Sequence, residues 1–338
     1  MKAKQAEAPL RVGILGYGAL ARAVAQNLRE RSGQVLLTGI ANRSGGRDAV
    51  GGDLRRGIAE LLATGPEVVL MATAPKIGLQ EEALAACAAA GVSVVSTCEE
   101  LSFPTVETAA AIDALDALAR KHAIAVTAAG VNPGFIFDYV PAVFAGGLPR
   151  VDGVRCRRVV DMAPFDPQRL RDVGLGLALN EFADAVERGQ VNGHVGYIQT
   201  GHYLAWRLGW REGVEVVQTF EPHSSGVPVT VGATTFEPGQ VIHVNQAASV
   251  RVHGTERIRL ELDLHLDPAA GGLPVVDEVC FTAEGLPDTR LTVSPGLPAA
   301  RTGAAVAVNA LAWIAAAAPG YYSLADWHPV SVWPRGEG

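Results

Sequence analysis

Short apolar runs alternate with helix-like stretches along the first 130 residues of the chain. Five of these runs are typical of buried strands, at residues 10–15, 35–44, 67–73, 92–97 and 123–130. The stretches between them repeat apolar residues at helical spacing, over residues 16–33, 79–91 and 105–122. Strands that alternate with helices predict crossover units, and therefore a parallel sheet.

The pattern changes after residue 150, where residues 154–160 read as a strand. A helical pattern over residues 167–189 is expected to be interrupted near Gly174 or Gly176. Between residues 214 and 294 several strand-like runs follow one another with few helices, which predicts a mostly antiparallel sheet. The last long helix is predicted over residues 298–318, because Pro and Gly follow it.

Together these patterns predict an α/β fold with two domains. Residues 1–145 are expected to form a Rossmann-like domain with a doubly wound parallel sheet, completed by a C-terminal helix at about 300–338. Residues 146–299 are expected to form a second, α+β domain with a mostly antiparallel sheet. Loops that contain Pro and Gly, near 141–150 and 295–300, are the predicted crossings between the domains.

The composition narrows the classes of partner. The chain is 49% apolar and 19% charged, which suffices for packed cores, and its net charge of −7 argues against nucleic-acid binding. No apolar run reaches the roughly 18 residues of a membrane span, so we expect no membrane contact. The first residues lack a secretory segment and the four cysteines form no CxxC pair. We therefore expect no metal site and a cytoplasmic location.

A glycine-rich turn follows the first predicted strand and opens the first predicted helix. Its residues are Gly16, Gly18 and Ala21, in the spacing of a dinucleotide-binding turn. The first glycine permits a tight turn, the second lets the backbone approach a pyrophosphate, and the small alanine lets the helix pack closely. Ala19 and Leu20 begin the helix, whose free amides attract phosphate. A plain glycine-rich turn is the alternative.

The end of the second predicted strand bears on the choice between NAD and NADP. NAD enzymes usually carry an acidic residue there for the ribose hydroxyls, but this chain has Asn42, followed by Arg43 and Ser44. A guanidinium and a hydroxyl suit a 2′-phosphate, so we expect NADP (NADPH) to be preferred, with NAD as the second choice. In the alternative interpretation Arg43 is an ordinary loop arginine.

Three further strand ends are expected near the same crevice, because ligands of open α/β sheets bind at the carboxyl ends of the strands. Ala72, Thr73 and Pro75 follow one strand and should lie beside the nicotinamide half. Glu99 and Glu100 follow the next strand, where a helix start is the alternative explanation for acidic residues. The sequence Asn132-Pro133-Gly134 follows the last strand and by itself suggests only a turn.

The blocks "GYGALARA", "VSVVSTCEELSFP", "TAAGVNPGFIFDYVP" and "NGHVGYIQTGHYLAWRLGW" together resemble the family of 2,4-diaminopentanoate dehydrogenase and the native amine dehydrogenases. The final stretch "GAAVAVNALAWIAAAAPGYYSLAD" resembles the last helix of that family. The resemblance implies an NAD(P)H-dependent enzyme that interconverts a ketone or aldehyde plus ammonia with a primary amine. It also implies a catalytic glutamate in the "CEEL" block, which we assign to Glu99, or to Glu100 if the register slips by one. Cys98, Asn132 and Pro133 complete the expected cofactor contacts, and Asn132 could orient the nicotinamide or the substrate.

The substrate is expected to meet residues from both predicted domains. The candidates are Val131, Ile136, Phe137, His194 and Thr302. The resemblance favours His194, because "GHVG" matches a family block, although an ordinary core or surface histidine is equally compatible. One of Arg155, Arg157 and Arg158 could clamp a substrate carboxylate, and surface arginines are the alternative.

Two other functions fit the same cofactor turn. One is a dehydrogenase of the homoserine or aspartate dehydrogenase type, and the other is an NADPH-binding regulator without catalysis. A homoserine dehydrogenase would carry a lysine where this chain has Glu99, and a regulator would need neither the glutamates nor the Asn132 turn. The apolar strands of the second domain hint at a homodimer.

Overall fold

The computed structural model describes residues 8–165, 167–327 and Val332. The chain folds into two compact units, which are Met1–Phe135 with Pro298–Gly338 (unit 1) and Ile136–Leu297 (unit 2). Residues 136–145, assigned to the first domain by the sequence, belong to unit 2. The chain returns to unit 1 at Pro298, close to the predicted position. Residues 328–331 and 333–338 of the expected C-terminal segment lie outside the described residues.

Unit 1 is built on the predicted parallel sheet, with strand order β16-β7-β6-β5-β1-β2-β4-β3. The five strands that the sequence predicted are β1 (Leu10–Leu15), β2 (Val35–Asn42), β5 (Val68–Met71), β6 (Ser93–Ser96) and β7 (Ala125–Ala128). Neighbouring strands are parallel except for the short pair β3 (Gly46–Arg47) and β4 (Asp53–Arg56). Because β2 and β5 lie on opposite sides of β1, the strand order reverses at β1, where such sheets bind ligands.

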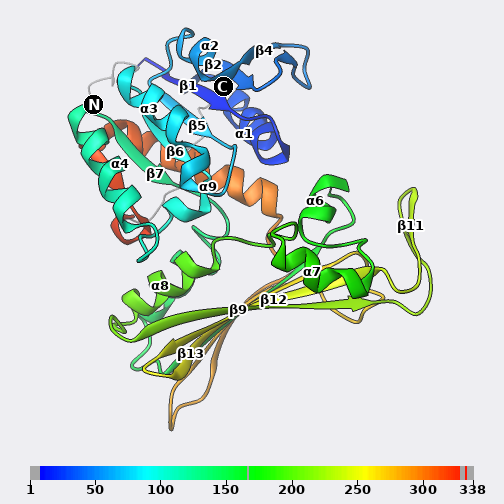
Figure 1. The fold of residues 1–338 in the computed structure, drawn as a ribbon. Helices are drawn as coiled ribbons and strands as arrows, with labels where there is room; N and C mark the ends of the chain where they lie inside the picture. The colour runs from blue at the N-terminus through cyan, green and yellow to red at the C-terminus, as the bar shows by residue number, and fades with distance from the viewer. Residues whose placement is uncertain (1–7, 166, 328–331, 333–338) are drawn as a thin grey trace. The chain divides into compact units, whose positions relative to one another are not determined.

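Helices pack on both faces of this sheet, so it is doubly wound as predicted (Figure 1). The helices are α1 (Ala19–Arg29), α2 (Gly57–Leu62), α3 (Glu81–Ala89), α4 (Ala109–Lys121) and α9 (Ala299–Ala316). Successive side chains of β5 point to opposite faces of the sheet. On one face, Val69 and Met71 join a core cluster with Leu61 of α2 and Leu84 of α3. All four residues of β5 are fully buried, as expected for a strand covered on both faces.

Helix α9 corrects the expectation that no apolar run of the chain is long enough to span a membrane. Its 18 residues have a mean hydropathy of 1.3, which by length and composition alone would allow it to cross a membrane. In unit 1, however, α9 packs against α1 and against β5, β6 and β7. Its side chains at Ala307, Val308 and Leu311 are fully buried there. The apolar character of α9 is therefore that of a core helix.

Several short elements of unit 1 were not predicted. They are the 3-10 turns η1 (Ile77–Leu79), η2 (Glu99–Leu101) and η4 (Leu324–Asp326), helix α2, and strands β3, β4 and β16 (Gly320–Tyr322). Strand β16 pairs with β7 through Tyr321 and Val126, almost 200 positions apart in the chain. Three residues carry too little periodicity to reveal such a strand, because its partner is provided by the tertiary fold.

Unit 2 contains a six-stranded sheet of order β15-β14-β8-β13-β12-β9. Its strands are β8 (Gly153–Asp161), β9 (Val214–Ser224), β12 (Val241–Val252), β13 (Thr255–His265), β14 (Asp277–Thr282) and β15 (Thr289–Val293). Only the pair β8–β13 is parallel, so the predicted mostly antiparallel sheet is confirmed. A small hairpin of β10 (Val229–Val231) and β11 (Thr234–Phe236) extends from it.

The helices of unit 2 confirm one expectation from the sequence and contradict another. They are α5 (Tyr139–Ala145), α6 (Pro167–Asp172), α7 (Phe182–Glu187) and α8 (Tyr197–Arg207), with a 3-10 turn η3 (Leu179–Glu181). The region near 141–150, expected to be a loop, contains α5. Its Pro141 lies in the first helical turn, where a missing backbone N–H costs nothing. The expected break between α6 and α7 is present, with Gly174 and Gly176 both at positive φ.

Helix α8 packs closely on one face of this sheet. A side chain at Gly201 would lie 2.8 Å from Val250 of β12 and 3.1 Å from Val216 of β9, so only glycine allows this approach. The opposite face carries cross-strand ion pairs, Arg155 with Glu261 at 2.6 Å and Arg157 with Asp263 at 3.0 Å. The two faces of the sheet are therefore chemically different, apolar under α8 and charged on the other side.

A row of three histidines crosses the charged face in register, from β9 through β12 to β13. The ring centroids of His223 and His243 are 4.8 Å apart, and those of His243 and His265 are 5.0 Å apart. Asp263 accepts hydrogen bonds from His243 and Asn245. Burial would raise the pKa of Asp263, but these bonds and the charge of Arg157 lower it to about 2.

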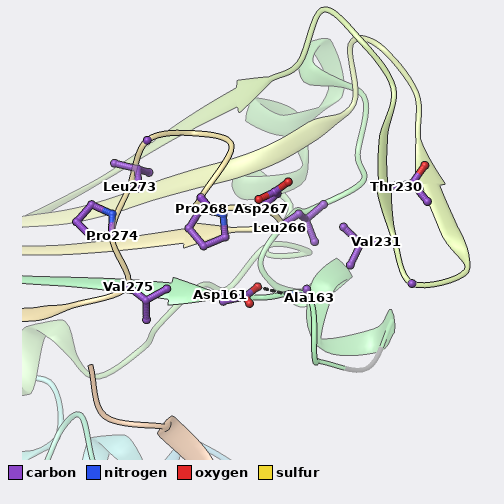
Figure 2. Close-up of a pocket in the computed structure, with 13 residues that line it drawn as sticks. Asp161, Ala163, Thr230, Val231, Leu266, Asp267, Pro268, Leu273, Pro274 and Val275 are labelled. Carbon is purple, nitrogen blue, oxygen red and sulfur yellow. Dashed lines mark hydrogen bonds between the residues drawn. The ribbon is translucent and has the colours of Figure 1, made fainter. Parts of the chain in front are cut away.

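His265 also binds a loop that lines a groove of about 700 Å³ in unit 2, and Figure 2 shows the lining residues of this groove. The loop Leu266–Val275 forms one wall and the β10–β11 hairpin forms the other. The backbone N–H of Asp267 donates to His265 Nδ1 at 2.8 Å, so that nitrogen must be unprotonated. Burial and the neighbouring His243 lower the pKa of His265, while the carboxylates of Asp161, Asp263 and Asp267 raise it less.

We expect the stability of the protein to fall as the pH drops below the ordinary histidine pKa of 6.5. In that range the unfolded chain binds a proton at His265 that the folded chain resists, which costs at most about 1.4 kcal/mol per pH unit. His265→Asn keeps an acceptor for Asp267 but cannot titrate. Its melting temperature should therefore fall less between pH 7.5 and 5.5 than that of the wild type, whereas His122→Asn serves as a matched control. Equal pH dependence in His265→Asn and the wild type would contradict this role.

Candidate cofactor and active site

Gly16 makes the tight turn that ends β1. Its N–H donates to the carbonyl of Ala41 at 2.7 Å, and its φ of +106° lies in the region that favours glycine. A side chain at this position would place its Cβ 2.1 Å from the carbonyl oxygen of Ala72. The turn after β1 and the end of β5 therefore touch through backbone, at the point where the strand order reverses.

Gly18 precedes α1 and has extended backbone, with no side chain capping the helix. A Cβ added at Gly18 would meet nothing within 4 Å. The first amides of α1, including those of Ala19, Leu20 and Ala21, have no partner within the helix by its geometry. Ala21 is fully buried where α1 packs on β1 and β2. Open space in front of unpartnered helix amides fits a pyrophosphate.

The loop after β2 presents basic side chains, some of which the sequence analysis missed. The side-chain oxygen of Asn42 accepts hydrogen bonds from the N–H groups of Ser44 and Gly45 at 3.0 and 2.6 Å, and so shapes this loop. Arg43 and Ser44 are exposed. Strand β4 pairs with β2 and brings Arg56 beside Asn42, where its guanidinium donates to the Ser44 carbonyl at 3.5 Å.

The loop after β5 continues from the contact with Gly16. Thr73 is exposed and Pro75 is half-buried. Cys98, expected to contact the cofactor, is buried, and its thiol donates to the Pro75 carbonyl at 3.1 Å. Burial raises the pKa of the Cys98 thiol to about 12, so it stays neutral. Any contact between residue 98 and a cofactor would therefore involve the backbone of Cys98 and not its thiol.

The two glutamates occupy the 3-10 turn η2 after β6, and their surroundings differ. The carboxylate of Glu100 accepts the N–H of Ile77 at 2.8 Å, so it is used to hold the loop after β5. Glu99 begins the turn and is half-buried, and its carbonyl accepts the hydroxyl and the N–H of Ser102. The structure thus places both glutamates in the turn after β6 and gives the Glu100 carboxylate a backbone partner in the loop after β5.

The turn after β7 is compact because of two glycines. A Cβ on Gly134, which has a φ of +132°, would lie 2.4 Å from the Gly130 carbonyl oxygen. Within this turn Pro133 is buried, and the side-chain oxygen of Asn132 is buried without a hydrogen-bond partner among the described residues. Such an atom is costly unless a ligand satisfies it, so the turn fits a carboxamide or another polar ligand group.

Helix α9 brings a further segment to the same region of unit 1. A Cβ on Gly303 would lie 3.1 Å from Leu20 of α1 and 3.8 Å from the backbone nitrogen of Val131. Thr302 precedes this contact and is half-buried. Unit 1 therefore gathers the starts of α1 and α9 and the turn after β7.

The remaining substrate candidates lie in unit 2. Ile136 and Phe137 are buried there, and the Phe137 ring stacks on Tyr197 with centroids 6.4 Å apart. The His194 ring contacts Tyr197 edge-on at 4.8 Å, and the His194 backbone exchanges two hydrogen bonds with the Gln246 side chain. Phe137 and His194 thus surround one tyrosine that the sequence analysis did not single out.

Each of the three candidate arginines has an acidic partner. Arg155 and Arg157 form the ion pairs of the charged face described above. Arg158 lies 3.3 Å from Asp277, and both of these side chains are almost fully buried. Burial lowers the pKa of Arg158 and raises that of Asp277, and each charge offsets the shift of the other. The interpretation of Arg155 and Arg157 as ordinary paired arginines fits the structure better than a carboxylate clamp. Among the described residues, no group of three or more His, Cys, Asp or Glu could hold a metal ion.

The two glycines of the cofactor turn allow a matched test. Gly18→Ala should fold as well as the wild type, because its Cβ has open space, but should weaken dinucleotide binding about tenfold or more by blocking the approach of the pyrophosphate. Gly16→Ala should instead lower the stability itself, by about 1–3 kcal/mol or more, because a φ of +106° strains alanine and its Cβ would lie 2.1 Å from the Ala72 carbonyl oxygen. Melting temperature and fluorescence titration with NADPH measure the two effects. Unchanged dinucleotide affinity in Gly18→Ala would contradict the assignment.

Comparison with known proteins agrees with this architecture. Residues 135–333, more than half of the chain, match the family model described as the 2,4-diaminopentanoate dehydrogenase C-terminal domain. The 2,4-diaminopentanoate dehydrogenase of Acetoanaerobium sticklandii is 25% identical over 94% of this chain and 93% of its own length.

Two solved structures share the fold. The amine dehydrogenase from Mycobacterium smegmatis superposes with a TM-score of 0.79 at 21% identity, over 96% of this chain and 98% of its own. GenD2 of gentamicin A biosynthesis, solved with NAD, has a TM-score of 0.51 at 15% identity, over 87% and 74% of the two chains. The chain therefore belongs to the 2,4-diaminopentanoate dehydrogenase family, and it is an NAD(P)-dependent oxidoreductase.

Proposed function

We propose that the protein is an amine dehydrogenase, which catalyses the reversible reductive amination of a ketone or aldehyde with ammonia. The observation that carries the proposal is the loop after β5, which touches both turns. Its residue Ala72 contacts Gly16 of the cofactor turn, and Pro75 accepts the N–H of Glu100 in the carboxylate turn. A carboxylate is thereby held beside the expected nicotinamide position. The names of two relatives, 2,4-diaminopentanoate dehydrogenase and amine dehydrogenase, support this reaction type.

The chemistry suits an anionic side chain. Ammonia adds to the carbonyl carbon, water leaves, and the resulting iminium carries a positive charge. NADPH, which the turn at Gly16 and Gly18 would hold, would supply the hydride that reduces this iminium. The carboxylate of Glu99 stabilises that cation and passes the proton between the adding ammonia and the leaving water. In the reverse direction it holds the substrate ammonium and accepts its proton. Overall, the carbonyl compound, ammonia, NADPH and one proton are converted into the amine, NADP⁺ and water.

The loop after β2 supports a preference for NADPH over NADH. Asn42 takes the place of the usual acid, and the exposed Arg43 and Ser44 are joined by Arg55 and Arg56 from β4. Guanidinium groups in such numbers suit a 2′-phosphate, which only NADP carries. NAD remains the alternative cofactor.

A substrate panel tests the reaction and the cofactor together. We expect loss of NADPH absorbance with ketones or aldehydes only when ammonia is present, and a slower loss with NADH. Consumption that needs no ammonia would indicate a dehydrogenase of the homoserine type instead. NADPH binding without turnover on any carbonyl would indicate a regulator. A preference for NADH would overturn the role given to Arg43 and its neighbours.

A second arm of the same assay addresses the proposed catalytic glutamate. Glu99→Gln removes the charge but keeps the shape, so we expect turnover to fall by about 100-fold or more. Its affinity for NADPH, measured by fluorescence titration, should stay close to that of the wild type. Near-normal turnover in this variant would remove Glu99 from the mechanism.

We also propose that the protein forms a homodimer through the charged face of the unit 2 sheet, which lies opposite α8 (Figure 1). This face carries a row of arginines beside a row of acidic residues, which are complementary in charge, and next to them a less polar patch of the exposed residues Val217 and Thr219. Val217, exposed by 37%, lies in that patch. Analytical ultracentrifugation should find a dimer for the wild type and a monomer for Val217→Asp. A monomeric wild type at micromolar concentration would contradict the proposal.

A further inference from the structure

We propose that Glu100 is a positioning residue, which joins the loops after β5 and β6 so that Glu99 is held in place. The inference rests on the proposed function, in which Glu99 performs the charge chemistry. In this role the carboxylate of Glu100, the second glutamate of the "CEEL" sequence, holds a loop and takes no part in proton transfer. The two neighbouring glutamates then have separate roles, one chemical and one structural.

Glu100 binds the loop after β5 through both its backbone and its side chain. Its N–H donates to the Pro75 carbonyl at 3.1 Å, and its carboxylate accepts the Ile77 N–H at 2.8 Å. The Cys98 thiol donates to the same Pro75 carbonyl. Residues 75–77 are therefore held at three points by the turn that contains Glu99.

A buried pair of polar side chains, Gln80 and Ser96, also links the loops after β5 and β6. The Ser96 hydroxyl donates to the Gln80 side-chain oxygen at 2.7 Å, and the Gln80 amide nitrogen donates to the Ala74 carbonyl at 2.7 Å. Ser96 also accepts the Cys98 N–H at 3.0 Å. Gln80 and Ser96 are 1% and 0% exposed, so these bonds are shielded from water and hold the loop geometry tightly.

The C-terminal segment holds the other side of the turn. The Tyr321 hydroxyl donates to the Leu101 carbonyl at 2.7 Å, and the Leu324 N–H donates to the Ser102 carbonyl at 2.9 Å. Burial raises the pKa of Tyr321, so its hydroxyl keeps the proton that it donates. The turn η2 is thus fixed between the loop after β5 and the strand β16.

The consequence is a link between cofactor binding and catalysis. The loop held by Glu100 is the one whose Ala72 contacts the cofactor turn, so a displaced loop would alter both the nicotinamide site and the position of Glu99. A displacement of about 1 Å can lower a rate by about 100-fold. Loss of the Glu100 carboxylate should therefore lower kcat and raise the KM for NADPH together.

The test compares Glu100→Ala, Glu100→Gln and Glu99→Gln with the exposed acid Asp113→Ala as a control. Glu100→Ala should lose about 10- to 100-fold in kcat and raise the KM for NADPH. Glu100→Gln keeps an oxygen that accepts the Ile77 N–H, so it should recover most of this loss. The pH profile of kcat/KM should keep the wild-type limbs in Glu100→Gln, because a positioning side chain takes no part in proton transfer. Asp113→Ala should behave as the wild type.

Each result decides between the two glutamates. If Glu100→Gln is as inactive as Glu100→Ala while both bind NADPH, Glu100 acts through its charge and the positioning role is wrong. If Glu99→Gln keeps normal turnover, the proposed chemistry of Glu99 fails, and this inference fails with it. Should Glu100→Ala not fold, Tyr321→Phe provides the second variant, since it removes only the bond to the Leu101 carbonyl. It should lower kcat with unchanged pH limbs, and unaltered kinetics would contradict the positioning of the turn.

Discussion

The backbone contact between the turn after β1 and the end of β5 is the constraint on which the candidate site depends. No side chain fits between Gly16 and the Ala72 carbonyl, so the two segments approach as only backbone can. From Ala72 the same loop runs to Pro75, which accepts the Glu100 N–H. The cofactor turn and the carboxylate turn are therefore joined through one short loop, and a disturbance of that loop reaches both.

Unit 2 depends on a different interaction. Its sheet has an apolar face under α8, and within that core lies the buried pair of Arg158 and Asp277. Both residues also bind the backbone of Leu297, the last residue of unit 2, so the pair fixes the point at which the chain leaves the sheet. A buried pair contributes little net stability when intact, but removal of one partner leaves an uncompensated charge.

Long, regular elements were predictable because their periodicity comes from burial on one or both faces. Five strands of unit 1, β1, β2, β5, β6 and β7, and the helices α1, α3, α4 and α9 were identified in this way. Helix α5 was missed because Pro141 resembles a loop signal, although proline is compatible with a first helical turn. Strand β16 was missed because three residues become a strand only when α9 returns the chain to β7.

The sequence by itself determined the order of strands and helices, the glycine-rich turn, and the strand ends at which candidate side chains sit. These follow from local rules of spacing and turn chemistry. Only the tertiary structure decided how neighbouring residues divide their roles. It directed Cys98 into the core, brought Arg56 beside Asn42, and paired Glu100 with the Ile77 N–H. The physical reason is that each of these partners comes from another strand or loop, and a chain read residue by residue does not reveal which segments will meet.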